Sequence, residues 1–457
     1  MIVYYFLIFI LPLSRHRIWG AMTGDITGIK YIGAICLPYA IFHLSRRRTM
    51  PAFLASWQVR FFLLLYLMVT VSYLLFSHMV IYFSHWLTYT SFIMFLFITM
   101  VVVDSLPRVR WSVLSGIGSI GLASAYVVRD WQLYHNISYD YRPGYVVGDP
   151  NYFTVDALLF LPVALLLLQQ RKPRWQWWFC LGCLAMTLAA VLFSASRGGF
   201  IGLVAACLYF LARSRQRIRN LILAVLAIGV LSLPMNISPV GRLLHPTQSD
   251  EFAKEIRLVV WSGGLELVEQ HPIFGVGLDN FRMEVGKHVD LSKVPVGETV
   301  QRVAHNSYLE IAAELGLPAL LLFLGIIIGS IFSLEQSRRA ALASGDEFLQ
   351  RVTMGLQAGL IGAGVALFFV SGEYQKMFWL TVFISAALPA MARSEQPAAA
   401  VAASARPYGY AGAPKQQPAL AGLAAGKSSG AARNEKKKGA PALPGGARWQ
   451  PSRFTNR

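Results

Sequence analysis

His305 is the residue of this chain whose setting is best suited to catalysis. It stands at the expected start of a helix, beside the polar residues Asn306 and Ser307. A neutral imidazole accepts a proton near pH 7, so His305 is a candidate general base. A lone histidine is more often a structural hydrogen-bonding residue, and that interpretation stays open. His85 has no comparable setting.

Arg197 could supply positive charge beside such a base. It lies in the sequence Ser196-Arg197-Gly198-Gly199, in which the glycines allow a tight turn and leave backbone N–H groups free at the start of the next helix. An arginine together with such donors forms an anion site. An arginine at a membrane boundary can instead extend towards the lipid headgroups.

Arg257 is a second candidate for anion binding. It lies on an expected amphipathic helix, with Trp261 four residues on and therefore on the same face. Arg257 is either a second phosphate-binding residue or a surface residue. In the surface role it would pair with Glu255 or Asp250, or stack on an aromatic ring.

Two pairs of polar residues flank these candidates. Asp149 and Asn151 precede an apolar segment, so either is expected to cap a helix and could also line the mouth of a site. Glu310 and Glu314 are one turn apart on the helix expected near His305. For Glu310 a solvated or interhelical pairing is favoured.

The composition indicates an integral membrane protein. Of the 457 residues, 55% are hydrophobic and only 14% are charged, with a mean hydropathy of +0.49. A soluble domain has about a quarter charged residues. The net charge of +18 comes from basic residues in short loops and in the C-terminal segment. That distribution fits membrane topology and not nucleic-acid binding.

The apolar runs predict an all-α, polytopic fold with about 12 transmembrane helices. The predicted helices are 2–13, 28–44, 60–82, 87–105, 112–128, 152–170, 176–194, 199–212, 219–234, 317–334, 352–371 and 376–392. With the N-terminus inside, every strongly basic short connection falls on one side, as the positive-inside rule requires. Two of these connections contain Arg108 with Arg110 and Arg338 with Arg339. Both termini are therefore expected in the cytoplasm.

The order of segments predicts four regions. Residues 1–242 form transmembrane helices 1–9, residues 243–316 a periplasmic loop that carries the candidate site, residues 317–393 transmembrane helices 10–12, and residues 394–457 a disordered basic cytoplasmic tail rich in Ala, Gly and Pro. Within the loop, Glu251–Gln270 has the spacing of an amphipathic helix, Gly275-Val276-Gly277 indicates a turn, and a second helix is expected from near His305 to about Gly316.

The sequence gives no support for a metal or another cofactor. The four cysteines, Cys36, Cys180, Cys183 and Cys207, all lie in apolar runs, where they are expected to pack between helices. No His, Cys or carboxylate residues have metal-ligand spacing. No cofactor is therefore expected.

Taken together, these segments resemble the O-antigen ligase/polymerase family of bacterial membrane glycosyltransferases. The matching motifs are Gly148-Asp149-Pro150-Asn151-Tyr152, Ser196-Arg197-Gly198-Gly199, Trp261 followed by His271-Pro272-Ile273-Phe274-Gly275-Val276-Gly277-Leu278-Asp279-Asn280-Phe281, and His305-Asn306-Ser307-Tyr308-Leu309 through Glu314-Leu315-Gly316. The resemblance does not separate lipid A–core O-antigen ligases from O-antigen polymerases, protein O-oligosaccharyltransferases or exopolysaccharide ligases.

The resemblance implies a metal-independent, inverting glycosyltransferase of the bacterial inner membrane. Its donor would be a glycan on undecaprenyl diphosphate, used at the periplasmic face in lipopolysaccharide biosynthesis. Arg197 and Arg257 match the arginines that hold the diphosphate, and His305 matches the base for the acceptor hydroxyl. The acceptor would be lipid A–core, a polysaccharide or a protein. The candidate lining residues are Asp149, Asn151, Trp261, Asn306, Tyr308 and Glu314.

A transporter for the same polyprenyl-linked glycan is the alternative from another class. Transporters place polar residues and broken helices near the membrane midplane, often within inverted repeats. Here the midplanes are expected to be apolar, and the polar groups gather at one face. That distribution favours an enzyme, and a non-catalytic assembly partner also stays open.

Overall fold

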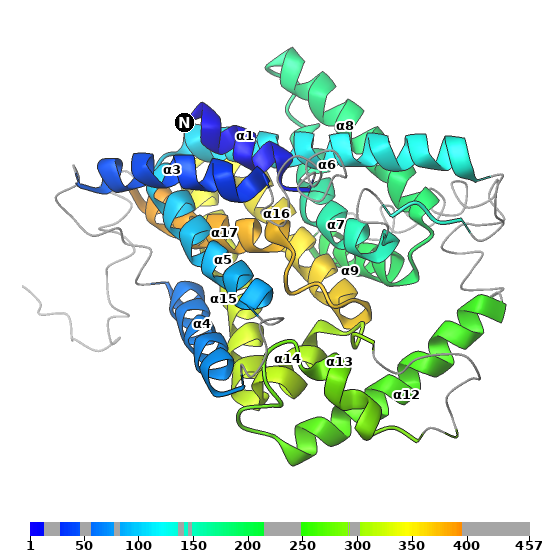
Figure 1. Ribbon diagram of the computed structural model, residues 1–457. Coiled ribbons are helices and arrows are strands. Elements are labelled where there is room, and N and C mark those ends of the chain that lie inside the picture. Colours follow the sequence, from blue (N-terminus) through cyan, green and yellow to red (C-terminus); the bar gives the residue numbers. More distant parts are fainter. Residues whose placement is uncertain are drawn as a thin grey trace, which may run out of the picture. The chain divides into compact units, whose positions relative to one another are not determined.

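A computed structural model describes residues 1–12, 28–45, 56–76, 83–135, 141–144, 149–213, 248–290, 292 and 302–394 (Figure 1). Within these ranges the regular structure is entirely helical, which confirms the all-α prediction. The helices belong to the first of two compact units, Met1–Ala403. The second unit, Ser404–Arg457, lies outside the described residues, as do the rest of the predicted tail from 395 and the predicted helix at 219–234.

Seven helices in the described part of the chain are long and apolar enough to cross a membrane. They are α4 (Trp57–Phe76), α5 (Phe83–Val102), α6 (Leu106–Tyr134), α7 (Pro150–Leu167), α8 (Arg174–Ser194), α15 (Leu317–Ser344) and α16 (Glu347–Ala366). Four further helices lie in predicted apolar runs but are not among these seven: α1 (Ile2–Ile10), α3 (Gly28–Ser45), α9 (Arg197–Arg213) and α17 (Lys376–Ser394). The helices therefore occupy eleven of the twelve predicted positions, but a count of about 12 spans is not confirmed.

Two predicted connections are helical in the structure. Arg108 and Arg110 lie in the first turns of α6, and Arg338 and Arg339 lie inside α15. In α15 the Glu335 carboxylate accepts hydrogen bonds from both arginines, each at 2.9 Å. Such pairs one turn apart stabilise a helix beyond its apolar part. Hydropathy alone therefore placed the start of α6 too late and the end of α15 too early.

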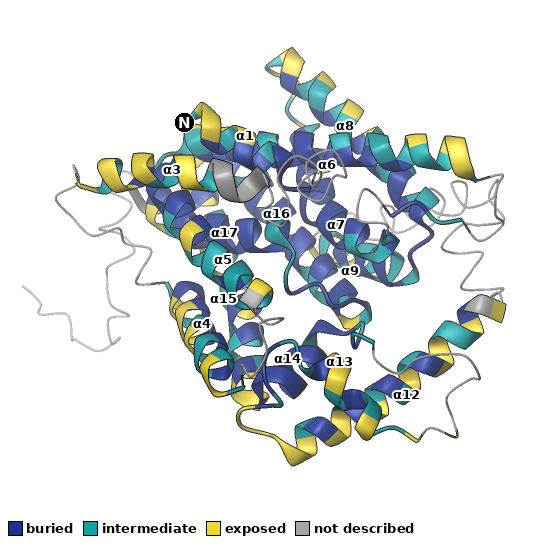
Figure 2. Cartoon of the chain, viewed as in Figure 1, coloured by how far each residue is buried: buried dark blue, intermediate teal, exposed yellow. Residues whose placement is uncertain are grey.

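Helices α7 and α16 form the enclosed centre of the first unit and pack against each other extensively (Figure 2). Small residues allow this close approach, as is common between membrane helices. A Cβ added at Gly359 of α16 would lie 2.5 Å from the Leu159 carbonyl oxygen of α7. Helix α9 approaches α16 in the same way, because Gly202 faces the Gly362 carbonyl oxygen. Both α7 and α9 are thus held against one central helix.

The outer faces of α4 and α15 are apolar (Figure 2). On α4, Leu67 and Leu74 are exposed to 56% and 70%, and on α15, Leu321 and Phe332 to 68% and 70%. Contiguous apolar surface of this kind is unfavourable in water but suits contact with lipid chains. These faces support the assignment as a membrane protein.

The chain between α9 and α15 contains short helices with a small core of their own. They are α12 (Gln248–Gln270), α13 (Phe281–Glu284), the 3-10 turn η5 (Val285–Lys287) and α14 (Ser307–Leu315). Helices α12 and α14 confirm the two helices predicted in this loop. Val260 and Leu267 of α12 pack with Phe281 and Ala313, which ties α12, α13 and α14 together.

The predicted glycine turn fixes the end of α14. Gly275 and Gly277 have φ angles of +64° and +102°, which favour glycine. The Val276 N–H donates to the Ala313 carbonyl at 2.8 Å, and the Gly277 N–H donates to the Glu314 carbonyl at 2.9 Å. A Cβ at Gly275 would lie 2.3 Å from the Glu314 carbonyl carbon. The turn therefore satisfies carbonyls at the end of α14 that have no partner within the helix.

Candidate active site

The first turns of α7 and α9 meet at the candidate site. Asp149 caps α7 by accepting from the Asn151 N–H at 2.7 Å, as the sequence predicts. The Asn151 side-chain oxygen accepts from the Ser196 hydroxyl at 2.7 Å. Ser196 in turn accepts from the Gly199 N–H at 3.2 Å. Asn151 thus links the two helix starts, and the network fixes the backbone where Arg197 begins α9.

Arg197 and Arg257 are both associated with α12. The Arg197 guanidinium lies 3.4 Å from the Asp250 carboxylate in the first turn of α12. Arg257 is seven residues further along this helix, a rise of about 10 Å. The Arg197 side chain keeps 27% exposure, so a guanidinium anchored at one nitrogen retains other N–H donors for a ligand. This arrangement supports the anion-binding interpretation of Arg197, which stays a prediction.

The backbone around His305 is held from both sides. Its φ of +49° lies in the left-handed region, which is unfavourable for a residue with a side chain. The preceding Ala304 donates its N–H to Glu310 at 3.2 Å, and its carbonyl accepts from the Trp261 indole at 2.7 Å. On the other side, the Asn306 side chain caps α14. These contacts fix the direction in which the imidazole leaves the backbone.

His305 shares a cavity of about 90 Å³ with Arg257 and Arg302. Its Nδ1 is buried and has no hydrogen-bond partner among the described residues. Burial and the positive charges of Arg257 and Arg302 lower the pKa of His305 to about 4, although Asp149 acts in the opposite direction. The ring is therefore neutral at pH 7 and able to accept a proton. Two arginines beside a neutral histidine agree with the predicted combination of anion binding and a base, which stays a prediction.

The Glu310 and Glu314 side chains are both buried, so of the two alternatives favoured for Glu310, solvation and interhelical pairing, the solvated one is wrong. Glu310 accepts from the Ala304 N–H and from the Ser371 hydroxyl, and Glu314 accepts from the Phe281 N–H at 3.3 Å. Burial raises the pKa of both carboxyls, and the charge of Glu310 adds to the effect at Glu314. Within the described residues, no three His, Cys, Asp or Glu side chains are placed to hold a metal ion. The two carboxyls instead hold neighbouring backbone in place.

None of the six candidate lining residues is among those that line the His305 cavity, and three of them make supporting contacts. The Tyr308 hydroxyl donates to the Gly364 carbonyl at 2.5 Å, and burial raises the pKa of Tyr308 to about 12. Tyr308 thus joins α14 to α16. Trp261 holds the carbonyl before His305, and Glu314 holds the start of α13.

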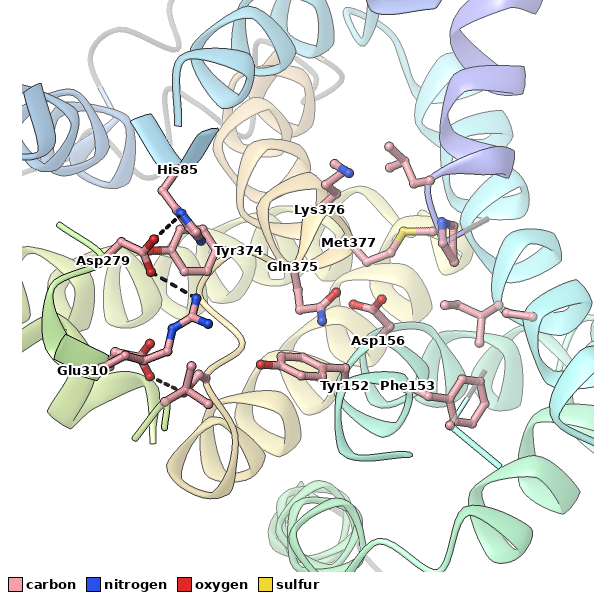
Figure 3. Close-up of a pocket in the computed structure, with 18 residues that line it drawn as sticks. His85, Tyr152, Phe153, Asp156, Asp279, Glu310, Tyr374, Gln375, Lys376 and Met377 are labelled. Atoms are coloured by element: carbon pink, nitrogen blue, oxygen red, sulfur yellow. Dashed lines mark hydrogen bonds and ion pairs between the residues drawn. The ribbon is translucent and has the colours of Figure 1, made fainter. Parts of the chain in front are cut away.

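A second cavity, of about 310 Å³ (Figure 3), shares one lining residue, Val303, with the His305 cavity. We call it the polar cavity. The Asp279 carboxylate lies 2.9 Å from His85 Nδ1 and 3.2 Å from the Arg282 guanidinium. Asp156 of α7 also lines this space, and its Oδ1 is buried with no hydrogen-bond partner among the described residues. The cavity is therefore walled by charged groups of both signs.

Sequence reasoning missed both His85 and Asp156. Nothing local marks His85, because its partner Asp279 lies far along the chain. Asp156 did carry a signal, since it is the one carboxylate in the apolar run 152–170. An ionisable residue in a membrane helix is a candidate functional residue. Asp156 is buried about two turns into α7, so this apolar helix carries an ionisable group in its packed part.

Comparison with protein families places the candidate residues in a known type of domain. Residues 181–324 match the O-Antigen ligase family, and this segment contains Arg197, Arg257 and His305. The match confirms the resemblance that the motifs carry. It extends from α8 to the start of α15 and so includes α9, α12 and α14. No curated protein matches the chain.

Proposed function

We propose that this membrane protein, whose residues 181–324 match the O-Antigen ligase family, transfers a glycan from undecaprenyl diphosphate to an acceptor hydroxyl. The acceptor is lipid A–core or a similar molecule, and the reaction takes place at the periplasmic face of the bacterial inner membrane. The reaction needs no metal ion and inverts the anomeric carbon. The observation that carries the proposal is the cavity in which His305 lies with Arg257 and Arg302.

The leaving group accounts for the arginines. Undecaprenyl diphosphate leaves with negative charge on its oxygens, and a guanidinium can bind such oxygens with two parallel hydrogen bonds. Arg257 of α12 lines the His305 cavity. Arg197 belongs to α9, but its guanidinium is held against α12 by Asp250. Fixed positive charge needs no reorganisation during the reaction. It therefore stabilises the negative charge that develops in the transition state more than it stabilises the bound donor. Arg197 and Arg257 together would thus bind the diphosphate.

The acceptor hydroxyl accounts for His305. Its neutral ring takes the hydroxyl proton while the acceptor oxygen forms a bond with the anomeric carbon. The bond between that carbon and the diphosphate oxygen breaks, and its electron pair leaves with the diphosphate. Attack opposite the leaving group inverts the carbon. The negative charge of the bound donor also raises the pKa of His305, because it offsets the two arginine charges.

Transfer by the purified protein tests the proposal. In liposomes that contain a glycan on undecaprenyl diphosphate and lipid A–core, we expect glycan-modified lipid A–core and free undecaprenyl diphosphate, with EDTA present throughout. Growing polymer or an acceptor protein, used in place of lipid A–core, separates a ligase from a polymerase or a protein O-oligosaccharyltransferase. Movement of the donor across the bilayer without covalent transfer would establish the transporter instead. Activity lost in EDTA and restored by a divalent ion would contradict a metal-independent reaction.

Thiol labelling tests the proposed topology. The four native cysteines are first replaced by serine. Ser292→Cys then reports on the loop that carries α12 and α14, and Ser428→Cys reports on the C-terminal segment. A membrane-impermeant reagent should label the first variant in intact spheroplasts and the second only after lysis. Labelling of the Ser292→Cys variant only after lysis would contradict a periplasmic site.

A further inference from the structure

Arg197, Arg257 and His305, the residues proposed for the donor chemistry, do not line the polar cavity, and we infer that this cavity binds the saccharide part of the acceptor, with Asp156 accepting a hydrogen bond from a sugar hydroxyl. This inference rests on the proposed transfer reaction. It adds the place where the acceptor lies and a residue that recognises it.

The size and charge of the polar cavity suit a sugar. Its volume of about 310 Å³ falls within the range of about 300–1,000 Å³ that is typical of small-molecule sites. Its wall carries carboxylates from Asp156, Asp279 and Glu310 together with the cations Arg282 and Lys376. A neutral polyhydroxyl ligand suits such a mixture, because each hydroxyl both donates and accepts. The His305 cavity, where the charged side chains among the described lining residues besides the imidazole are Arg257 and Arg302, suits an anion instead.

Asp156 differs from the other carboxylates of the polar cavity in having an oxygen to spare. Asp279 is held by His85 and Arg282. Glu310 accepts from a backbone N–H and a serine hydroxyl. Asp156 is only 9% exposed, and its Oδ1 makes no hydrogen bond within the described residues. A buried oxygen without a partner is costly, so it is poised to accept from a donor that a ligand brings.

The neighbours of Asp156 complete a binding surface. Figure 3 shows Asp156, Tyr152 and Gln375 around the same space, from α7 and from the residue before α17. The amide of Gln375 can both donate and accept. The rings of Tyr152 and Tyr374 add flat apolar surface, against which the C–H face of a sugar ring can lie.

The position of the polar cavity favours the acceptor over the donor. Val303 lines both this cavity and the one that contains His305 and Arg257. The diphosphate requires the arginine side. An in-line displacement requires the acceptor oxygen to approach from the side opposite the diphosphate. A sugar in the polar cavity would approach His305 from the side of Val303. The sugar hydroxyl would then reach the base from the side opposite the diphosphate.

Binding of delipidated core oligosaccharide to the detergent-solubilised full-length protein tests the site without any donor. Asp156→Asn keeps the shape but replaces one accepting oxygen by an amide NH2 group, which donates, and should raise the Kd roughly 10- to 100-fold. Tyr152→Phe, which removes only a hydroxyl, should raise it less. Glu269→Gln changes an exposed carboxylate on α12 and should leave the Kd unchanged. In the transfer assay, the KM for lipid A–core should rise in parallel for Asp156→Asn while the donor KM stays constant.

The thermal midpoint of the ligand-free protein separates recognition from structure. Removal of a buried charge should leave that midpoint unchanged or raise it. A lower midpoint with unchanged Kd would assign Asp156 to structural pairing with Lys376, whose charge acts on it, and would overturn the inference. No binding to the wild type, or equal Kd values for wild type and Asp156→Asn, would also overturn it. Binding without any transfer would defeat the proposed function and leave the cavity assignment standing.

Discussion

The two cavities that share Val303 in their walls differ in charge and in how the chain builds them. The smaller one draws its cations and its base from α12 and from the segment just before α14. The polar cavity collects side chains from α5, α7, α13, α14 and the start of α17. The first suits an anionic leaving group, and the second suits a polyhydroxyl ligand. Donor and acceptor functions should therefore respond to different substitutions, which makes the comparison testable.

The largest effect is expected from removal of the base in the smaller cavity. His305→Ala should lower kcat by about 10² to 10⁴, the usual contribution of general-base catalysis, while the protein still inserts and folds. The measurement is the initial transfer rate with both substrates saturating. His288→Ala removes an imidazole that pairs with Glu266 away from both cavities, and should retain its rate. An undiminished kcat for His305→Ala would remove the base assignment.

Two residues of the smaller cavity, His305 and Arg257, could be selected as candidates from the sequence because their signals are local, whereas Arg302 was not selected. His305 stands beside a helix cap, and Arg257 lies on a helix whose apolar spacing is regular. The glycine turn was predictable for the same reason. The sequence does not show the two hydrogen bonds that fix the Ala304 backbone, because Trp261 and Glu310 reach it from separate helices.

The polar cavity could not be predicted as a unit, because its walls meet only through the packing of distant helices. His85 and Asp279 come from distant parts of the chain. Asp156 was visible as a charge in an apolar run, but its unpartnered oxygen depends on the packing around it. The predicted positions of two helix ends were wrong for a related reason. Hydropathy detects the apolar part of α15, whereas the Glu335 ion pairs that extend it are not apolar.

A smaller effect is expected from changing the shape of the cation while its charge is kept. Arg257→Lys and Arg197→Lys lose the planar fork, so kcat/KM for the donor should fall roughly 10- to 100-fold. The KM for lipid A–core should stay constant, because the polar cavity is untouched. Arg351→Lys, which alters an arginine paired with Glu347 on α16, is the matched control. Near wild-type transfer by both site variants would favour the headgroup role of these arginines over diphosphate binding.

The pH dependence distinguishes the free enzyme from the donor complex. In the free protein, burial and the neighbouring arginines lower the pKa of His305 to about 4, so the acid limb of kcat/KM should lie near that value. A bound diphosphate offsets the arginine charges and raises the pKa, so the acid limb of kcat should lie at higher pH. Both acid limbs are read from initial rates between pH 3 and 8. This range includes the pKa of about 4 for His305 and the ordinary pKa of an imidazole. Coincident limbs would mean that the diphosphate does not bind beside His305.

The smallest effect concerns Glu314, which lies one turn from Glu310 and holds the start of α13, next to Arg282 of the polar cavity. Burial and the charge of Glu310 raise its pKa above the ordinary 4.5. Its contribution to stability is therefore fully present below about pH 4.5 and is lost as the pH rises through the folded-state pKa, at up to about 1.4 kcal/mol per pH unit. Glu314→Gln keeps an oxygen for the Phe281 N–H but no longer titrates. Its thermal midpoint should therefore fall less steeply with rising pH than that of the wild type, whereas parallel curves would show that ionisation of Glu314 does not limit stability.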